Sequence, residues 1–408
     1  MICRYCGSQL KHEFIDLVNA PPSNSFLTKE QLNEPEVSYP LKLFVCAKCF
    51  LVQINEYKKS GDIFGQNYAY FSSYSTSWLD HAKRYADMIV HRFGYDSNSQ
   101  VIEIASNDGY LLQYFQTKEI PALGIEPARN VARTAQAKGI ETIVDFFGLN
   151  LADYLVAQSR MADLIIGNNV FAHVPDINDF VAGMKKVLKK DGVITLEFPH
   201  LMQLVEQTQF DTIYHEHFSY FSFHTAGIIV NHYGLDIFDV EQLPTHGGSL
   251  RIYLKHKEDK SKKISDNVSA LSAKEESNGM LGLPYYEDFN DKVNKVKYNF
   301  IKFLLQQKMK GRKVAAYGAA AKGNTLINYC GVKKDLIEFV VDASPHKQGM
   351  YLPGSHIPIV NEEHIREARP DFVFILPWNI KEEIMQQLEY IRKWDGKFAI
   401  AIPEVRIF

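Results

Sequence analysis

The sequence has no apolar run approaching the roughly 20 residues that span a bilayer, so we expect no transmembrane helix. Its first four residues, Met-Ile-Cys-Arg, do not begin the apolar segment of a signal peptide. Neither sign of charge predominates, since 45 Lys and Arg face 48 Asp and Glu in 408 residues. These absences give no reason to expect a membrane or nucleic-acid partner. They predict a cytoplasmic protein, for which a monomer is the simplest state.

The Gly-x-Gly-x-x-Gly run, which lets a backbone approach a pyrophosphate, is also absent. Residues 101–126 nevertheless have the layout of a nucleotide-binding crossover: an apolar strand, a small polar turn, a helix and a second strand that stops at an acid. Such an acid can hold both hydroxyls of a ribose. A ribose without a neighbouring diphosphate favours S-adenosylmethionine (SAM) over NAD. The cofactor candidates here are Glu103, Ala105, Asn107, Gly109 and Glu126.

Strand-like segments continue at 141–144, 163–167 and 192–198, with helical segments between them. This alternation predicts a parallel sheet with helices on both faces, whose ligands bind at the carboxyl ends of the strands. Asp145 could accept a hydrogen bond from the adenine amine, and Phe146 could stack on the ring. Asn168 follows the fourth strand, where it could face the methyl donor or cap the next helix.

Cysteine is scarce, with five in the chain, and four of these form two Cys-x-x-Cys pairs. Cys3, Cys6, Cys46 and Cys49 fit the four thiolates of a closed, structural zinc site. Free thiols or two redox pairs are the alternatives, and redox motifs seldom come as two such pairs. The fifth, Cys330, is interpreted as a small buried hydrophobe.

The densest polar cluster is Tyr214-His215-Glu216-His217. One interpretation is acid–base chemistry by a histidine that titrates near neutral pH. A metal site is a second, although no third ligand is obvious nearby. A hydrogen-bonded buried cluster without a catalytic role is the third.

Two later segments are candidates for anion binding. In the first, residues 245–251, two glycines precede Arg251, which could clamp a phosphate or carboxylate; the alternative is a plain hairpin turn between strands at 236–243 and 249–255. In the second, a turn at residues 318–324 opens a helix, and helix N-termini attract anions. Gly318, Lys322 and Asn324 would hold a diphosphate there, unless the turn is only structural.

The pattern as a whole predicts an α/β protein of three parts. Residues 1–72 form a zinc-binding module with short β-rich runs at 41–45 and 50–54. Residues 73–258 form a Rossmann-like SAM domain that begins with a helix at 77–93. Residues 259–408 form a smaller Rossmann-like α/β domain, preceded by a polar connector or exposed helix at 257–275 and a long helix at 285–310. Its strands are expected at 313–317, 337–341, 372–376 and 397–401.

These motifs, in this order, make the chain resemble the SAM-dependent nucleotide-sugar C-methyltransferases over nearly its whole length. The resemblance rests on the cysteine pairs, residues 103–109, 214–217, 245–251 and 317–324. It implies a class I SAM domain, a C-terminal domain that holds the nucleotide, and an NDP-4-keto-deoxyhexose as substrate in deoxysugar biosynthesis. The active-site residues that it implies are Tyr68, His173, Tyr214, Glu216 and His217.

The reaction expected from this resemblance is C-methylation, at C-3, through an enolate. His217 would abstract the proton next to the ketone. Tyr68, Tyr214 and His173 would donate hydrogen bonds to oxygens, and Glu216 would orient an imidazole or hold a hydroxyl. Three alternatives stay open: an NAD-dependent nucleotide-sugar oxidoreductase, an O- or N-methyltransferase acting on a sugar, and a non-catalytic zinc-ribbon adaptor.

Overall fold

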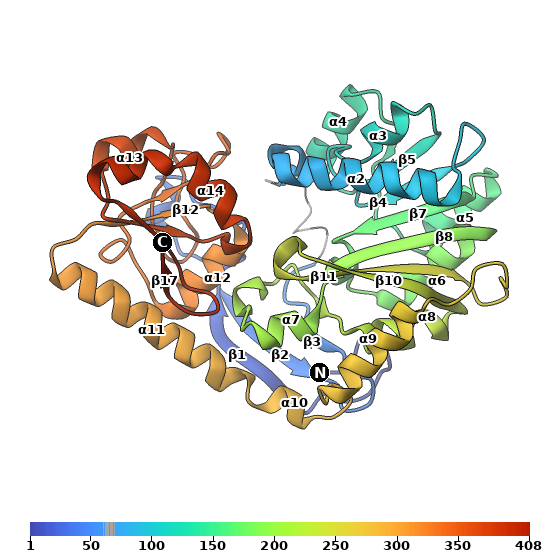
Figure 1. Ribbon diagram of the computed structural model, residues 1–408, viewed down its shortest axis with the longest axis horizontal. Helices are drawn as coiled ribbons and strands as arrows, with labels where there is room; N and C mark the ends of the chain where they lie inside the picture. The colour runs from blue at the N-terminus through green and yellow to red at the C-terminus, as the bar shows by residue number, and fades with distance from the viewer. Residues whose placement is uncertain (60, 62–64, 66–67, 69) are drawn as a thin grey trace.

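The computed structural model describes residues 1–408 except 60, 62–64, 66–67 and 69 (Figure 1). The described residues form three sheets. The first is a four-stranded antiparallel sheet in the order β1-β2-β3-β9, with β1 at His12–Ala20, β2 at Tyr39–Val45, β3 at Val52–Ile54 and β9 at Ser219–Tyr220. The predicted runs at 41–45 and 50–54 are β2 and β3. The N-terminal sheet thus takes its last strand from the middle of the chain.

The central sheet has seven strands in the order β10-β11-β8-β7-β4-β5-β6. These are β4 (Val101–Ile104), β5 (Ala122–Ile125), β6 (Thr142–Ile143), β7 (Ala162–Asn168), β8 (Leu188–Pro199), β10 (Leu235–Leu243) and β11 (Ser249–His256). Strands β4 to β8 are parallel, and β11 is antiparallel to both β8 and β10. Chain order reverses between β4 and β7, and such a switch point is where open α/β sheets bind ligands.

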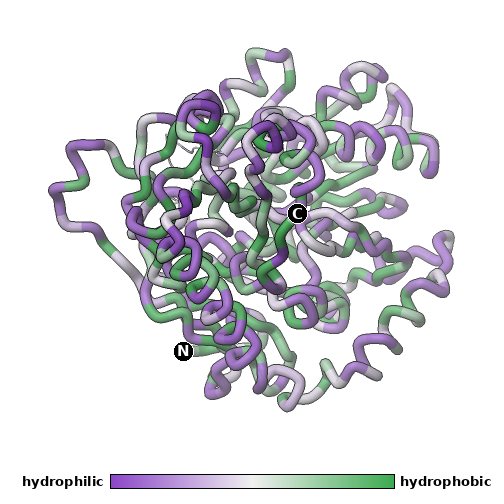
Figure 2. The backbone as a smooth tube through the Cα atoms, turned by 60° about the vertical axis from the view of Figure 1, so that its left-hand side comes forward, coloured by the Kyte–Doolittle hydropathy of each residue, from purple (hydrophilic) through white to green (hydrophobic). Residues whose placement is uncertain are grey.

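Alternate residues of these strands enter two different hydrophobic cores, as a sheet covered on both faces requires. Val101 and Leu164 pack with α2 (Thr76–Phe93) and α3 (Leu112–Gln116). Ile102 and Ile165 face the opposite core. That core includes α5 (Leu149–Ala157), α6 (Ile177–Val187) and α8 (Phe223–His232). Helix α4 (Arg129–Ala137) joins the first layer through Ala135. Hydrophilic residues predominate on the outer segments of the molecule, and hydrophobic residues gather toward the inside (Figure 2).

The C-terminal sheet has six strands in the order β14-β13-β12-β15-β16-β17, all parallel except β17. Its strands are β12 (Val314–Tyr317), β13 (Val340–Val341), β14 (Ile359–Val360), β15 (Phe372–Ile375), β16 (Lys397–Ile400) and β17 (Arg406–Ile407). Its helices are α12 (Ala321–Cys330), α13 (Glu363–Ala368) and α14 (Lys381–Gln387). The Rossmann-like arrangement expected for this part is therefore present, although β13 is shorter than the predicted strand at 337–341.

The segments between the sheets are more helical than expected. Residues 257–275, expected to be a connector or an exposed helix, end in α9 (Asp266–Ser277), which buries Leu271 and Glu275. The carboxylate of Glu275 accepts hydrogen bonds from the backbone N–H groups of Phe223 (2.6 Å) and His224 (2.8 Å) at the start of α8. The long helix predicted at 285–310 is α10 (Pro284–Glu287) followed by α11 (Phe289–Met309). The residues described include no helix with the length and hydropathy of a membrane span.

The two ends of the chain share one hydrophobic core. Strand β1 lies against α11 (Figure 1), and the ring of Phe14 stacks on that of Phe289 with centroids 4.6 Å apart. This core continues into the C-terminal sheet through Val314 and Phe374. The N-terminal and C-terminal sheets are therefore held in a fixed relation by apolar packing. The domain boundaries at residues 72 and 258 stay predictions.

Phe14→Ala is expected to lower the free energy of unfolding by about 3–5 kcal/mol, because the substitution leaves a cavity between β1 and α11. Chemical denaturation followed by circular dichroism measures this loss. Val37→Ala is the matched control, since 61% of the Val37 side-chain surface is exposed. Equal stability of the two variants would contradict the shared core.

Candidate functional site

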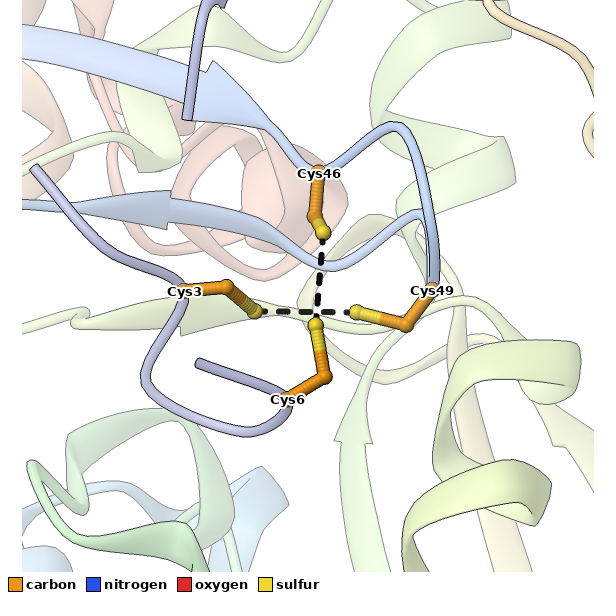
Figure 3. A group of neighbouring side chains, drawn as sticks. All are labelled: Cys3, Cys6, Cys46 and Cys49. Carbon is orange, nitrogen blue, oxygen red and sulfur yellow. Dashed lines mark hydrogen bonds between the residues drawn. The ribbon is translucent and has the colours of Figure 1, made fainter. Parts of the chain in front are cut away.

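The four paired cysteines converge on one point (Figure 3). All four Sγ atoms lie within 4.8 Å of one another, and the closest pairs, Cys3–Cys49 and Cys6–Cys46, are 3.6 Å apart. Thiolates bound tetrahedrally at 2.3 Å from zinc lie roughly 3.8 Å from each other, so this spacing fits a zinc ion. The side-chain amide of Gln53 donates to the Cys3 sulfur at 3.2 Å, and the Lys48 backbone N–H donates to the Cys46 sulfur at 3.4 Å. Such outer hydrogen bonds orient metal ligands.

The turn after β4 has the backbone of a ligand-binding loop. Ala105, Asn107 and Gly109 all have positive φ, at 57°, 50° and 77°. A Cβ at Gly109 would overlap the Ile140 side chain, so glycine is required there. Glu126, at the end of β5, accepts hydrogen bonds from the backbone N–H groups of Asn107 (3.0 Å) and Ala128 (2.8 Å). The acid predicted from the sequence thus lies directly beside the loop.

Burial raises the pKa values of two acids at this loop, Glu126 and Glu103. It raises the pKa of Glu126 to about 7, against the two backbone donors that lower it. Burial also raises the pKa of Glu103 well above its usual value, while the neighbouring Tyr110 hydroxyl acts in the opposite direction. Asn168 is buried and is the last residue of β7, the strand that pairs with β4. Asp145 and Phe146 lie past the end of β6 and are exposed.

The chain segment before α2 is fastened to this loop. The Asn107 side chain accepts from the Ser72 N–H at 2.8 Å and donates to the Tyr70 carbonyl at 3.3 Å. One residue earlier in the described chain, Tyr68 exchanges two backbone hydrogen bonds with the side chain of Asn130 on α4, at 3.2 and 2.9 Å. Residues 67 and 69 of this segment lie outside the described residues. Tyr68 is thereby carried from the N-terminal module to the edge of the central sheet.

His217 has a fixed tautomer. Its Nδ1 lies 2.9 Å from the carbonyl oxygen of Thr212, and because a carbonyl only accepts, Nδ1 carries the proton. Nε2 therefore bears the lone pair and accepts from the Tyr214 hydroxyl at 2.8 Å. Burial, and then the neighbouring His173, lower the pKa of His217 well below its usual value. The imidazole is neutral at physiological pH, with its basic nitrogen toward Tyr214.

The other predicted catalytic residues surround this pair. The His173 ring lies edge-on to His217, with centroids 4.7 Å apart. The carboxylate of Glu216 accepts from the Asn24 amide at 2.7 Å and from the Tyr68 hydroxyl at 3.4 Å. His215 points elsewhere, with Nε2 at 3.3 Å from the carbonyl oxygens of Tyr39 and Pro40. The structure thus brings together all five residues implied by the resemblance and separates His215 from them.

Residues of the C-terminal domain border the same cluster. The Lys322 ammonium donates to the Asn379 side chain at 2.7 Å and lies over the Trp378 ring, 5.1 Å from its centroid. Burial lowers the pKa of Lys322, while the charge of Asp211 raises it. Asn324 is buried and donates to the Ser23 carbonyl of the N-terminal module at 2.6 Å. A Cβ at Gly318 would overlap Pro377, so close packing alone already requires this glycine.

Arg251 is enclosed in a buried charge network. It donates to Glu197 and to Glu241, both at 2.8 Å, and its guanidinium lies over the Tyr85 ring. Glu197 also contacts His81 at 2.9 Å. Burial alone would raise the pKa of Glu197, but the His81 and Arg251 contacts bring it down to about 2. Because both carboxylates are already paired with it, Arg251 is poorly placed to clamp a substrate anion in this conformation. The hairpin predicted from the sequence is present, formed by β10 and β11.

Comparison with known proteins decides the family. Family models match residues 3–64 (a zinc binding domain), 78–240 (a methyltransferase domain) and 244–403 (the C-terminal domain of C-methyltransferases). The chain is 32% identical over 405 residues to C-methyltransferase NovU of Streptomyces niveus, covering 99% of this chain and 96% of that protein. The chain is a C-methyltransferase. Its methyl donor is SAM and its structural metal is zinc, as the sequence predicted.

Two solved structures also resemble part of this C-methyltransferase. The PH0226 protein of Pyrococcus horikoshii is 13% identical with a TM-score of 0.37, covering 46% of this chain and 95% of that one. The 1,6-didemethyltoxoflavin-N1-methyltransferase of Burkholderia thailandensis, solved with S-adenosylhomocysteine, is 13% identical with a TM-score of 0.37, covering 51% and 95%. These likenesses are too distant to bear on the substrate. Membership of the C-methyltransferase family disfavours the oxidoreductase, the O- or N-methyltransferase and the adaptor.

Sequence reasoning missed several residues that shape the site. Asn24 binds Glu216, Asn130 holds Tyr68, and the Thr212 carbonyl fixes the His217 tautomer. A backbone acceptor leaves no signal in the sequence. Asn24 and Asn130 act across separations of 192 and 62 residues, so no local pattern could have assigned them.

Metal analysis of the purified enzyme should find about one zinc per chain, as a closed four-thiolate site requires. Cys46→Ser should reduce the zinc content and lower the unfolding temperature, because it removes one of the four ligands. Cys330→Ala is the matched control, since Cys330 is buried in the C-terminal core away from the cluster. Retention of a full zinc equivalent in the Cys46 variant would refute the assignment.

Proposed function

We propose that this enzyme methylates carbon 3 of an NDP-4-keto-deoxyhexose, with SAM as the donor and an enolate as the intermediate, in deoxysugar biosynthesis. The observation that carries the proposal is the tautomer of His217. A saturated carbon becomes nucleophilic only after deprotonation, which a neighbouring ketone makes possible. Deprotonation needs an unprotonated base in a water-poor site, and the Nε2 lone pair of His217 meets that requirement.

His217 is proposed as the base that removes the C-3 proton. Burial and His173 keep its imidazole neutral before the substrate binds. A diphosphate nearby, and the negative charge of the forming enolate, would raise the pKa of His217 and so favour proton transfer to it. The Thr212 carbonyl stabilises the imidazolium that results, because the Nδ1–H donor persists in both states.

Hydroxyl donors around His217 are proposed to stabilise the enolate oxygen. The Tyr214 hydroxyl, which donates to His217 Nε2 in the free enzyme, would turn to the enolate oxygen once the substrate C–H faces Nε2. Tyr68 reaches the same cluster through Glu216. Burial raises the pKa of both phenols well above the usual value, so each remains a hydrogen-bond donor. His173 is proposed as a further donor. Glu216, held by Asn24, is proposed to accept from a sugar hydroxyl.

The methyl donor is proposed to lie at the switch point between β4 and β7. Glu126 would accept both ribose hydroxyls, while the turn from Ala105 to Gly109 would approach the methionine part. Asp145 and Phe146 are proposed at the adenine, where their present exposure leaves both side chains free to contact a ligand. Glu103 and Asn168 complete the proposed donor site. The β4 turn needs no further glycines, because SAM brings no pyrophosphate.

The C-terminal domain is proposed to hold the nucleotide diphosphate. The N-terminus of α12, with Gly318, Lys322 and Asn324, lies beside the cluster that contains His217. Lys322 supplies a positive charge in a buried setting, where an anionic partner is favoured. Arg251, whose partners here are Glu197 and Glu241, would have to release one of them to bind an anion.

His217→Asn should abolish methyl transfer and leave the affinity for SAM nearly unchanged, because the base is lost while the donor site is intact. Turnover is measured by mass gain on a panel of 4-keto nucleotide sugars, and affinity by calorimetry. His215→Asn is the matched control, a neighbouring histidine that faces the N-terminal sheet. Solvent deuterium should enter C-3 in the wild type without SAM but not in the His217 variant. Exchange that persists in that variant would reassign the base.

SAM should bind more tightly as the pH rises from about 6 to 8, because the raised pKa of Glu126, about 7, leaves the acid partly protonated below neutrality. Only the carboxylate accepts from both ribose hydroxyls. Glu126→Gln should weaken SAM binding and remove this dependence on pH, as titration calorimetry at several pH values would show. Glu141→Gln is the matched control, because Glu141 is an exposed acid to which no ligand contact is assigned. An unchanged pH profile in the Glu126 variant would exclude the assigned role.

A further inference from the structure

A short 3-10 helix connects the base to the C-terminal domain. This helix, Phe210–Thr212 (η4), provides the carbonyl oxygen that accepts from His217 Nδ1. All three of its residues are buried. The orientation of the imidazole therefore depends on where η4 lies. Within the central domain, η4 follows α7 (Leu201–Glu206), and the side chain of Gln209, the residue before η4, donates to the Gly247 carbonyl at 2.7 Å. Because η4 is not part of a strand, no sheet hydrogen bond among the described residues fixes its position.

The C-terminal domain holds η4 by directional contacts. The Trp378 indole N–H donates to the Asp211 carboxylate at 2.7 Å, and the Thr325 hydroxyl of α12 donates to the Ile213 carbonyl at 2.7 Å. The Phe210 ring meets Tyr329 of α12 edge-on, at 5.6 Å between centroids. Donors on two separate elements of the C-terminal domain thus fix the segment that carries the Thr212 carbonyl.

Loss of the hydrogen bond from Trp378 would be unfavourable for Asp211. Its side chain is fully buried, and an unpaired buried carboxylate is costly. The indole, which donates to one of the two carboxylate oxygens, is confined in turn, because Trp378 packs closely against Gly247 and lies beneath the Lys322 ammonium. A Cβ at Gly247 would overlap the indole. Trp378 therefore joins η4, the β10–β11 connection and the proposed diphosphate loop.

We propose that Trp378 is a positioning residue for methyl transfer, which holds the base in its reactive tautomer through Asp211 and the Thr212 carbonyl. The proposal rests on the proposed role of His217 as the base. In this proposal Trp378 acts through η4 and not by touching the donor or the reacting carbon. It belongs to the domain proposed to hold the nucleotide, so the base is correctly oriented only when that domain is seated against η4.

Trp378→Phe tests the proposal, because it removes the indole N–H and keeps an aromatic ring. The kcat for methyl transfer should fall about 10- to 100-fold, as expected for a displaced catalytic group, while the affinity for SAM stays the same. The ¹⁵N spectrum of histidine-labelled enzyme should show His217 losing its single Nδ1–H tautomer. Trp394→Phe is the matched control, since Trp394 donates to the Pro370 carbonyl within the same domain and should leave kcat and the tautomer unchanged.

A loss of activity in Trp378→Phe can be distinguished from a folding defect. Trp378 borders an open groove of about 450 Å³, so the smaller ring does not create a sealed cavity. Zinc content and circular dichroism verify the fold. Thr325→Val gives a second test, because it removes only the hydroxyl bound to the Ile213 carbonyl and should shift the tautomer in the same direction. Wild-type kcat and an unchanged His217 tautomer in both variants would overturn the proposal.

The tautomer spectrum also separates this proposal from the assignment of the base. Full turnover by His217→Asn would remove the base assignment, whatever Trp378 does. A tautomer change in Trp378→Phe without any loss of kcat would show that Trp378 orients His217 but that the orientation is not used in the reaction. That result would overturn the positioning role in catalysis, although it would agree with a hydrogen-bonded connection from Trp378 through Asp211 to His217.

Discussion

The stretch from Phe210 to Tyr220 is hydrogen bonded to the N-terminal, central and C-terminal parts of the fold, and these bonds bring the active-site cluster together. Its last two residues pair with β3 of the N-terminal sheet. The Phe218 N–H donates to the Ala172 carbonyl, just past β7 of the central sheet, at 2.8 Å. The Ile213 carbonyl accepts from α12 of the C-terminal domain. Four of the five clustered side chains lie on or beside this stretch or the turn after β7, so the three parts of the fold converge on one imidazole.

Local patterns in the sequence were sufficient for the parts of the fold with local causes. The apolar strand, turn and acid of residues 101–126 predicted the β4 turn and the place of Glu126, because both depend on residues close in sequence. The cysteine spacing predicted the zinc cluster for the same reason. By contrast, β9 has only two residues, and β1 carries a polar stretch, so neither has a periodicity strong enough to identify it. Their pairing is set by tertiary contacts.

The same distinction applies to the site. Tyr214, Glu216 and His217 were recognisable as a dense polar cluster, but what orients them was not. His217 is oriented by a main-chain carbonyl, Glu216 by an asparagine 192 residues away, and Arg251 is occupied by acids from two strands. Arg251 shows most clearly how a local motif can suggest a ligand contact that the fold does not provide. An arginine after two glycines suggests an anion clamp, yet the partners supplied by the fold are carboxylates of the protein itself.

The pairing of β1 with α11 has a consequence for biosynthesis. On the ribosome, Phe14 and its neighbours emerge long before Phe289, their packing partner. The apolar face of β1 therefore stays uncovered while most of the chain is translated, and the N-terminal sheet also waits for β9. Nascent chains that expose such surfaces depend on chaperones and are prone to aggregate. The zinc cluster, whose ligands all lie within the first 49 residues, can form early and hold the N-terminal module until the rest arrives.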